Sequence, residues 1–393
     1  MRLLTQRILR LFCAFALIFQ FMNTMAQDAL VTVPALPDTD GKHVNAHGGC
    51  LLHLGTTWYW YGEARPEHGF TSLGVSLYTY DEPLPQPRIK GMLDGPGMVR
   101  TLSFVQDKSW VNRGVVLAVV DSVGSPIERG CIIERPKVIY NRKTKQFVML
   151  FHLELKGRGY EAAQVGFAVS DKAEGPFTFH HSQRPNAGRW PSDWTDADIA
   201  RAQAHKPGDF AKEWTDEWLQ AVRDGMFVAR DFEQGQMSRD MTVWEDERGR
   251  WWHIFSSEEN MTLQAAELSE DCLSYTGRYY RIAAGGQNEA PVLFRMEGRL
   301  WMICSGCTGW APNAARMFSA TSIEGLWEQH PSPMRGDGAE ITFGGQGAFA
   351  FVEHNRTWFL GDVWNPRSLA NSCHICAEIT MWDGDTPTIH RWW

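Results

Sequence analysis

The chain has 393 residues, of which 44% are hydrophobic and 21% are charged, a composition that excludes a mostly disordered or fibrous protein. The formal net charge is −8 and no lysine- or arginine-rich run stands out, so a groove for nucleic acid is not expected. The 18 tryptophans suggest stacking against a flat ligand such as a sugar ring, with core packing between sheets as an equal alternative.

The N-terminus has the pattern of a secretory signal peptide. Three arginines come before an apolar core that runs from Leu11 to Met22. Thr24 and Ala26 then place small residues at the −3 and −1 positions of a cleavage after Ala26. We therefore predict a signal peptide over residues 1–26 and a secreted or periplasmic mature chain over residues 27–393, with an uncleaved anchor as the alternative. No later stretch is long and apolar enough for a bilayer span.

The cysteines favour buried free thiols. Cys13 leaves with the signal peptide, so seven of the eight remain, and an odd number is a poor disulfide framework. Cys304 with Cys307, and Cys373 with Cys376, have zinc-like spacing, but each pair lies in or beside a strand-like run whose alternate side chains point to opposite faces. Disulfides remain an alternative, and we predict no bound metal and no cofactor.

One supersecondary unit occurs five times along the chain. In each copy a polar residue opens an apolar run, a turn with Gly or Asn follows, and an aromatic strand comes next, which is typical of a β-hairpin. The intervals between copies suit the blades of a propeller. We therefore predict an all-β, five-bladed β-propeller, with the terminal pair Trp392-Trp393 packing so that the ring closes against an N-terminal strand.

The longest interval between units contains an insertion, at about residues 182–236. It is rich in tryptophan and charge, and residues 195–202 and 213–223 have helical patterns, with Thr195 or Asp196 as a possible N-cap. The insertion is either a subdomain that borders the substrate or a decoration without ligand contact.

Propeller geometry brings the residues that open the units together. The innermost strand of each blade lines the central channel, so these residues surround one channel mouth. Neighbouring carboxylates raise one another's pKa, which suits general acid catalysis near neutral pH. The residues are Asn45 with its neighbour His47, Glu134, Asp240, Glu289 and Gln346.

The motifs at these positions resemble glycoside hydrolase family 43, and within it the branch of exo-β-1,3-galactanases. The resemblance implies a five-bladed propeller and a secreted, inverting glycosidase, a monomer that releases galactose from β-1,3-galactan or the side chains of plant arabinogalactan. The matching stretches run through nearly the whole mature chain and include residues 45–49, 134–141, 238–242, 289–291, 305–313 and 364–366.

The resemblance also implies roles for individual residues. Glu289 corresponds to the general acid, Asp240 to the carboxylate that orients and tunes it, and Glu134 to the acid that binds the sugar 2-hydroxyl. No Asp opens the first blade, so Gln346 is expected to handle the attacking water, with Glu134 as the competing candidate. The candidate substrate-binding residues are His47, Glu63, Tyr160, Asn260, Thr308 and Trp310.

Two departures keep other functions open. Gly345 and Gly347 flank Gln346, where the branch usually has Ser or Thr, so the same chemistry on an α-L-arabinofuranoside or β-xyloside is the first alternative. The absence of an Asp at the start of the first blade keeps a non-catalytic carbohydrate-binding propeller as the second.

Overall fold

The computed structural model describes residues 36–81, 110–353, 355–381 and 384–391, and the backbone of 88–90 and 99–101. The predicted signal peptide and the pair Trp392-Trp393 lie outside these residues. In the described part of the chain, no helix has both the length and the apolar character of a membrane span.

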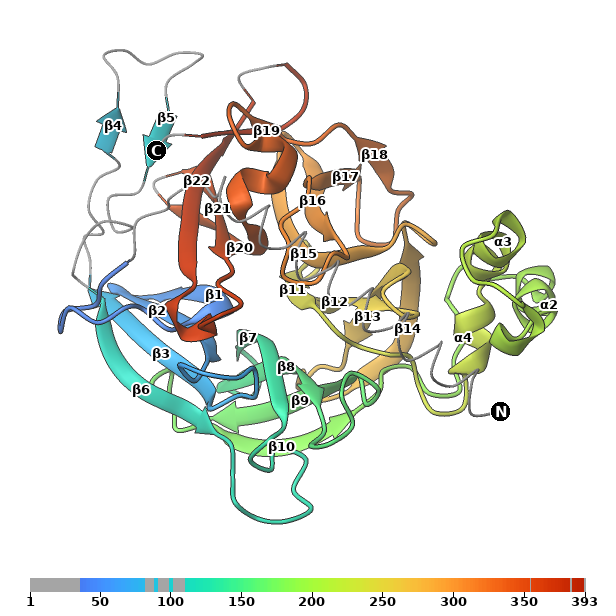
Figure 1. Cartoon of the computed structure of the whole chain (residues 1–393), viewed down its shortest axis with the longest axis horizontal. Helices are drawn as coiled ribbons and strands as arrows, with labels where there is room; N and C mark the ends of the chain where they lie inside the picture. Colours follow the sequence, from blue (N-terminus) through green and yellow to red (C-terminus); the bar gives the residue numbers. More distant parts are fainter. Residues whose placement is uncertain are drawn as a thin grey trace, which may run out of the picture.

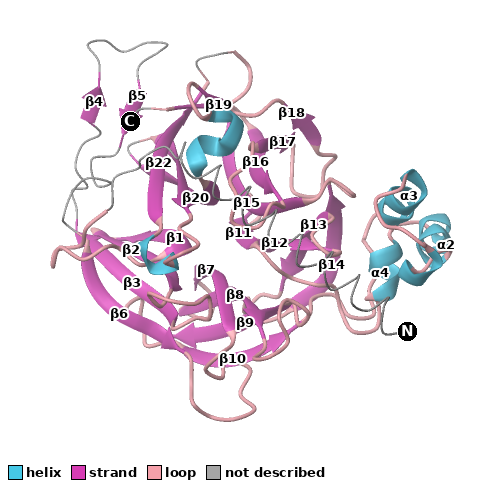
Figure 2. Ribbon diagram, viewed as in Figure 1, coloured by secondary structure: helices cyan, strands magenta, loops and turns pink. Residues whose placement is uncertain are grey.

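Five sheets, antiparallel except for the pairing of β19 with β23, surround a central axis, which confirms the predicted five-bladed β-propeller (Figure 1; Figure 2). The first blade contains β1 (His47–Leu54), β2 (Thr57–Ala64), β3 (Gly74–Asp81) and β6 (Val111–Ala118), with a hairpin of β4 (Arg88–Lys90) and β5 (Val99–Thr101) between the last two. The second contains β7 (Ile132–Asn141), β8 (Gln146–Glu154), β9 (Gln164–Ser170) and β10 (Thr178–Gln183). The third contains β11 (Met241–Glu245), β12 (Trp251–Ser257), β13 (Thr262–Leu268) and β14 (Tyr275–Ile282).

The remaining two blades complete the ring. The fourth contains β15 (Asn288–Met296), β16 (Arg299–Gly306), β17 (Arg316–Ala320) and β18 (Glu328–His330). The fifth contains β20 (Gln346–Glu353), β21 (Arg356–Val363), β22 (Cys373–Thr380), β23 (Thr388–His390) and β19 (Met334–Arg335), with the short helices η3 (Ala339–Gly344) and η4 (Leu369–Asn371) in its connections. In each blade the first long strand is the innermost one (Figure 1).

The hydrophobic cores lie between neighbouring blades. Four buried clusters join blade 1 to blades 4 and 5, blade 1 to blade 2, blade 2 to blade 3, and blade 3 to blade 4. Trp60, Trp252, Trp301 and Trp358 are fully buried in two of these clusters. These four tryptophans are therefore core residues, as their large apolar area favours.

The seven cysteines in the described part of the chain are free thiols, as predicted. Five of them are buried and two, Cys307 and Cys373, are partly exposed.

Four of the five innermost strands begin with a β-bulge. The register of strand pairing shifts directly after His47, Glu134, Glu289 and Gly347. Because a bulge adds one residue to one strand, it bends that strand and redirects the side chains beside it. After each bulge the side chains of the strand alternate between the two faces of the sheet. The opening residue before the bulge does not follow this alternation.

The bulges correct one sequence assignment. His47, rather than Asn45, occupies the position in blade 1 that Glu134 and Glu289 occupy in their blades, because each precedes a residue with left-handed backbone, namely Gly48, Arg135 and Ala290 at φ of 59°, 53° and 51°. Asn45 instead binds the backbone of Arg65, accepting from its N–H at 3.0 Å and donating to its carbonyl at 2.7 Å.

The insertion projects from the rim of the propeller beside blade 3 (Figure 1). It contains α2 (Asp196–Gln203), η2 (Pro207–Asp209), α3 (Asp216–Asp224) and α4 (Met226–Arg230), so both predicted helical segments form helices. Thr195 caps α2 by accepting a hydrogen bond from the N–H of Asp198, as its sequence position indicates. Helices α3 and α4 share a small core, which also includes Met261 from blade 3.

The expected closure of the ring stays a prediction, because residues 1–35 and 392–393 lie outside the described part of the chain. The last described strand, β23, pairs with β22 and β19 of its own blade. Blades 1 and 5 are joined through Asp362 on β21, which is 1% exposed. Its carboxylate accepts from the N–H of Gly48 at 2.8 Å and lies 3.3 Å from Nδ1 of His47 and 3.1 Å from Nδ1 of His374.

Removing this carboxylate should destabilise the protein. We expect Asp362→Ala to lower the free energy of unfolding by about 3–5 kcal/mol, because two buried imidazoles and a buried N–H lose their partner. Urea unfolding followed by tryptophan fluorescence measures the change. Asp121→Ala, which removes an exposed ion pair with Arg129, is the control and should leave the midpoint unchanged. Equal midpoints for both variants would show that Asp362 does not hold the ring.

Candidate active site

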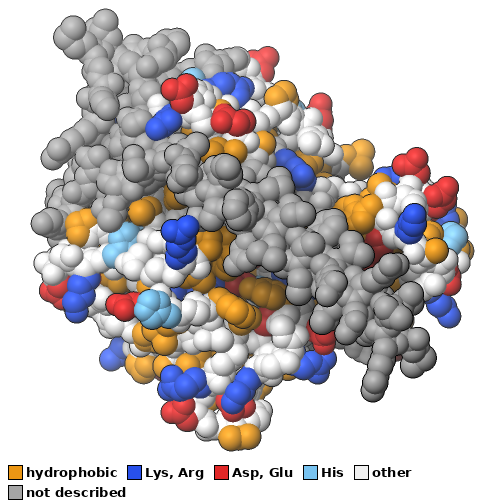
Figure 3. Space-filling view, viewed as in Figure 1, with side chains coloured by type: hydrophobic (Ala, Val, Ile, Leu, Met, Phe, Trp, Pro, Cys, Tyr) orange, Lys and Arg blue, Asp and Glu red, His pale blue; other side chains and the backbone are white. Residues whose placement is uncertain are grey.

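A cavity of about 300 Å³ occupies the mouth of the central channel. All five blades contribute to its walls, and acidic and apolar side chains are visible in a hollow near the centre of this face (Figure 3). The lining residues are Glu63, Arg65, Glu134, Arg135, His152, Tyr160, Arg239, Asp240, Asn260, Glu289, Gly309, Trp310, Gln346 and Trp364.

Eight of the ten candidate site residues line this cavity. They are Glu63, Glu134, Tyr160, Asp240, Asn260, Glu289, Trp310 and Gln346. The opening residues of blades 2 to 5 converge as the repeat geometry predicts.

His47 and Thr308 do not line the cavity, and their predicted contact with the sugar stays a prediction. His47 is fully buried beside Asp362, with its ring centroid 5.7 Å from that of Trp364. Thr308 is exposed, and its hydroxyl donates to the carbonyl of Ala311 while accepting from Asn313. His47 therefore packs behind a cavity residue, and Thr308 fixes the loop that carries Trp310.

The sequence interpretation missed six lining residues. They are Arg65, Arg135, His152, Arg239, Gly309 and Trp364. Four of these six can carry positive charge. Carboxylates that converge in a buried site need nearby cations, and this requirement was a general signal for the four. Arg135 directly follows Glu134 and Arg65 lies two residues after Glu63, so both were adjacent to residues already identified.

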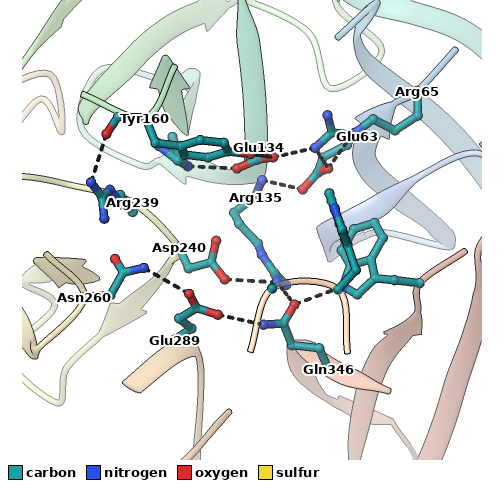
Figure 4. Close-up of a pocket in the computed structure, with 14 residues that line it drawn as sticks. Glu63, Arg65, Glu134, Arg135, Tyr160, Arg239, Asp240, Asn260, Glu289 and Gln346 are labelled. Atoms are coloured by element: carbon teal, nitrogen blue, oxygen red, sulfur yellow. Dashed lines mark hydrogen bonds and ion pairs between the residues drawn. The ribbon is translucent and has the colours of Figure 1, made fainter. Parts of the chain in front are cut away.

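Glu134 is held as a carboxylate. Its Oε1 accepts from Nη2 of Arg65 at 2.8 Å and from the hydroxyl of Tyr160 at 2.9 Å, and its Oε2 lies 3.1 Å from Nδ1 of His152 (Figure 4). Burial raises the pKa of Glu134, but the hydrogen bond to His152 and the charge of Arg65 outweigh it and keep the pKa well below the usual range.

His152 is in turn held as a cation. Its Nε2 lies 2.9 Å from Oε1 of Glu154, so the imidazole is placed between two carboxylates. Burial lowers the pKa of His152, but the hydrogen bonds to Glu134 and Glu154 raise it to about 9 overall. At neutral pH the pair of Glu134 and His152 is therefore ionic.

Glu289 has the opposite environment. Its Oε1 accepts from Nδ2 of Asn260 at 2.9 Å, and its Oε2 lies 3.4 Å from Nε2 of Gln346 (Figure 4). Burial first, and then the negative charge of Asp240, raise the pKa of Glu289 to about 7. Glu289 therefore keeps its proton in mildly acidic solution.

Arg135 neutralises Asp240. Its Nη2 lies 3.0 Å from Oδ2 of Asp240 and also donates to the amide oxygen of Gln346, while its Nη1 donates to the carbonyl of Gly347 at 2.8 Å. The guanidinium lies 5.7 Å from the ring centroid of Trp364. Arg135 of blade 2 is thus held by contacts from blades 3 and 5.

The amide of Gln346 is fully engaged. Its nitrogen donates to the hydroxyl of Ser305 at 2.9 Å in addition to its contact with Glu289. Its oxygen accepts from Nε1 of Trp364 at 2.9 Å and from Arg135. A water molecule can reach this amide only if one of these contacts opens.

Among the described residues, two side-chain groups have ligand atoms close enough together for a metal ion. One is His47, Asp362 and His374, and the other is Glu134, His152 and Asp240, with all ligand atoms of each group within 4.8 Å of one another. A metal ligand must be a neutral imidazole, whereas His152 has a pKa of about 9. The second group therefore fits an ion pair better than a metal site.

The arrangement can perform acid chemistry on a polar ligand. Two carboxylates in one cavity whose pKa values move in opposite directions provide a proton donor, Glu289, and a fixed negative charge, Glu134. Trp310 and Trp364 add an aromatic corner, with ring centroids 5.2 Å apart and planes inclined at 67°.

Comparisons with known proteins show which family the chain belongs to. The model of glycosyl hydrolases family 43 matches residues 210–382. The chain is 43% identical to the solved GH43 β-1,3-galactosidase BT3683 with galactodeoxynojirimycin, with a TM-score of 0.82, covering 92% of this chain and 99% of that one. A comparison with curated proteins gives no match.

Two further solved structures are similar to this chain over only part of their own length. The GH43 β-1,3-galactosidase BT0265 is 28% identical with a TM-score of 0.69, over 91% of this chain and 61% of that one. The exo-β-1,3-galactanase 1,3Gal43A from Clostridium thermocellum is 25% identical with a TM-score of 0.66, over 92% and 64%. This chain therefore spans less than two thirds of both proteins.

Removing the charge of Asp240 should lower the pKa of Glu289. We expect Asp240→Asn to shift this pKa below about 7, because the mutation removes a negative charge and frees Arg135 to act on Glu289. A pH titration of ¹³C-carboxyl-labelled glutamate measures the pKa, with Glu289→Gln to assign the signal and Asp121→Asn as the remote control. An unchanged or higher pKa in Asp240→Asn would exclude this electrostatic role.

Proposed function

The chain belongs to glycosyl hydrolases family 43 and is a glycosidase, and on this premise we propose that it is an inverting exo-β-1,3-galactosidase. The proposed substrates are β-1,3-galactan and the side chains of arabinogalactan, from whose ends it releases galactose. The observation that carries the proposal is the pair of oppositely tuned carboxylates, Glu289 and Glu134, in one cavity.

Glu289 is the general acid in this proposal. Hydrolysis of a glycoside requires a protonated carboxyl group at the leaving oxygen, and a pKa of about 7 leaves Glu289 protonated in mildly acidic solution. Burial and, after it, the charge of Asp240 raise the pKa of Glu289 to this value. Asn260 holds one oxygen of the acid, so that the other can face the glycosidic bond.

Glu134 stabilises the reacting sugar. Its ion pairs with Arg65 and His152 leave it ionised over the whole working range of pH. A fixed carboxylate that accepts a hydrogen bond from the 2-hydroxyl binds the ring more strongly as positive charge develops on it. Trp310 and Trp364 supply flat apolar surface for the sugar's C–H groups.

Gln346 handles the attacking water in this proposal. An inverting enzyme needs its acid and its water-orienting group about 6.5–9.5 Å apart, yet the amide of Gln346 lies 3.4 Å from Glu289. The arriving sugar must therefore break that contact. Because an amide is a poor base, Gln346 then acts by holding the water or through its imidic tautomer, whose nitrogen accepts the water's proton.

The choice of galactose rests on the 43% identity to a β-1,3-galactosidase over 92% of the chain. We further propose that residues 1–26 are removed on export to the periplasm or the exterior, and that the mature enzyme acts as a monomer. Intact-mass measurement of the exported protein and light scattering test these two points.

A substrate panel tests the proposed activity. We expect β-1,3-galactobiose and aryl β-galactosides to be cleaved, and ¹H NMR to detect α-galactose as the first-formed anomer. Release of arabinose or xylose instead would assign the alternative specificity within the family. Binding of galactan without hydrolysis of any member of the panel would contradict the enzyme assignment.

Glu289→Gln should lose on the order of 10²–10⁴-fold in rate on β-1,3-galactobiose, since the sugar leaving group needs a proton. A 2,4-dinitrophenyl β-galactoside needs little acid assistance and should be affected much less. Steady-state kinetics on both substrates measure the difference. Equal losses would make Glu289 a binding residue.

Azide should distinguish the two candidates for water handling. In Gln346→Gly, azide can enter the space of the lost amide and is expected to yield α-galactosyl azide, whereas Glu134→Ala should show no such rescue because Glu134 binds the 2-hydroxyl. Product NMR identifies the azide adduct. Rescue of Glu134→Ala together with an active Gln346→Ala would reverse the assignment.

A further inference from the structure

The turn between β12 and β13, residues 258–260, has an unusual backbone. Glu258, Glu259 and Asn260 are consecutive and all left-handed, with φ of 54°, 56° and 62°. None is glycine, and a residue with a Cβ adopts this region only at a cost. Such a conformation persists where the surroundings fix it, and it occurs often at functional sites.

The first residue of the turn is clamped within blade 3. Glu258 is fully buried and its carboxylate accepts from Arg281 of β14 through Nε at 2.8 Å and Nη2 at 2.6 Å. Gln264 of β13 donates to the same carboxylate at 3.1 Å. A bidentate arginine pair of this kind fixes direction as well as distance.

The helical insertion holds the same turn from outside the propeller. Arg281 also donates to the carbonyls of Val222 at 2.8 Å and Arg223 at 2.7 Å, in the last turn of α3. Arg230 of α4 donates to Glu259 at 2.8 Å. Met261, directly after the turn, is 2% exposed and packs into the core of α3 and α4.

The last residue of the turn reaches the acid. Asn260 donates to Oε1 of Glu289 at 2.9 Å, and this contact joins blade 3 to blade 4 across the cavity (Figure 4). The Sγ of Cys307 lies 3.9 Å from the carbonyl of Asn260. A continuous series of contacts therefore runs from the helices through the turn to Glu289.

We propose that the insertion is a positioning element for the general acid, and that Glu258, Arg230 and Arg281 are positioning residues that act through Asn260. None of the three lines the cavity, so none touches the sugar. The proposal rests on the assignment of Glu289 as the acid. It gives the insertion a catalytic purpose and excludes its interpretation as a decoration.

The test compares two substrates with different needs for acid. We expect Glu258→Gln to reduce kcat on β-1,3-galactobiose on the order of 10-fold or more, since small misplacement of a reacting group is costly, while kcat on a 2,4-dinitrophenyl β-galactoside stays nearly unchanged. Arg230→Gln should show the same selectivity to a smaller degree, and it carries the test if Glu258→Gln does not fold. A loss of equal size on both substrates in these variants would overturn the proposal.

A double mutant and a matched control separate positioning from stability. Asn260→Ala should show the same selective loss, and adding Glu258→Gln to it should cause no further loss. Arg201→Gln removes an exposed ion pair that lies within α2 of the same insertion. It should leave kcat on both substrates unchanged. Additive losses, or a selective loss in Arg201→Gln, would contradict the proposal.

Measuring Glu289→Gln on the same two substrates separates failure of the positioning proposal from failure of the acid assignment. If Glu289→Gln shows the leaving-group dependence and Glu258→Gln does not, only the positioning proposal fails. If Glu289→Gln itself shows none, the acid assignment fails and the positioning proposal fails with it.

Discussion

Four carboxylates, Glu63, Glu134, Asp240 and Glu289, share one channel mouth, and the cations beside them are unevenly distributed. Arg65 pairs with both Glu63 and Glu134, and Arg135 pairs with Asp240. Among the described contacts, Glu289 receives hydrogen bonds from neutral amides and has no ion pair of its own. Burial and the charge of Asp240 raise the pKa of Glu289, whereas His152 and Arg65 hold the pKa of Glu134 down. The acid chemistry of the site follows from this difference between the two carboxyl groups.

The fold was predictable because its signal is local. Hairpins with aromatic strands and Gly or Asn turns repeat five times, and a propeller is the architecture that joins such units in a ring. The side chains at the openings were less predictable, since a bulge changes which residue faces the channel and a shift of one residue moves a side chain to the other face. For this reason the sequence pattern indicated Asn45 as the residue that opens the first strand, where the structure has His47.

The contacts that tune the site are long-range and leave no local pattern. Arg65 meets Glu134 across 69 residues, and Arg281 meets the carbonyl of Val222 across 59. Arginine and histidine occur throughout the chain, so composition could not select the ones that line the cavity. The role of the insertion was open for the same reason, because only the fold brings α3 and α4 beside the 258–260 turn.

The central claim is that Glu289 is protonated while Glu134 is ionised in the same cavity. Neutron diffraction of deuterated crystals at about pH 6 observes these protons directly. We predict a deuteron on the carboxyl group of Glu289, none on Glu134, and a doubly deuterated imidazole at His152. A bare carboxylate at Glu289, or a deuteron on Glu134, would contradict it.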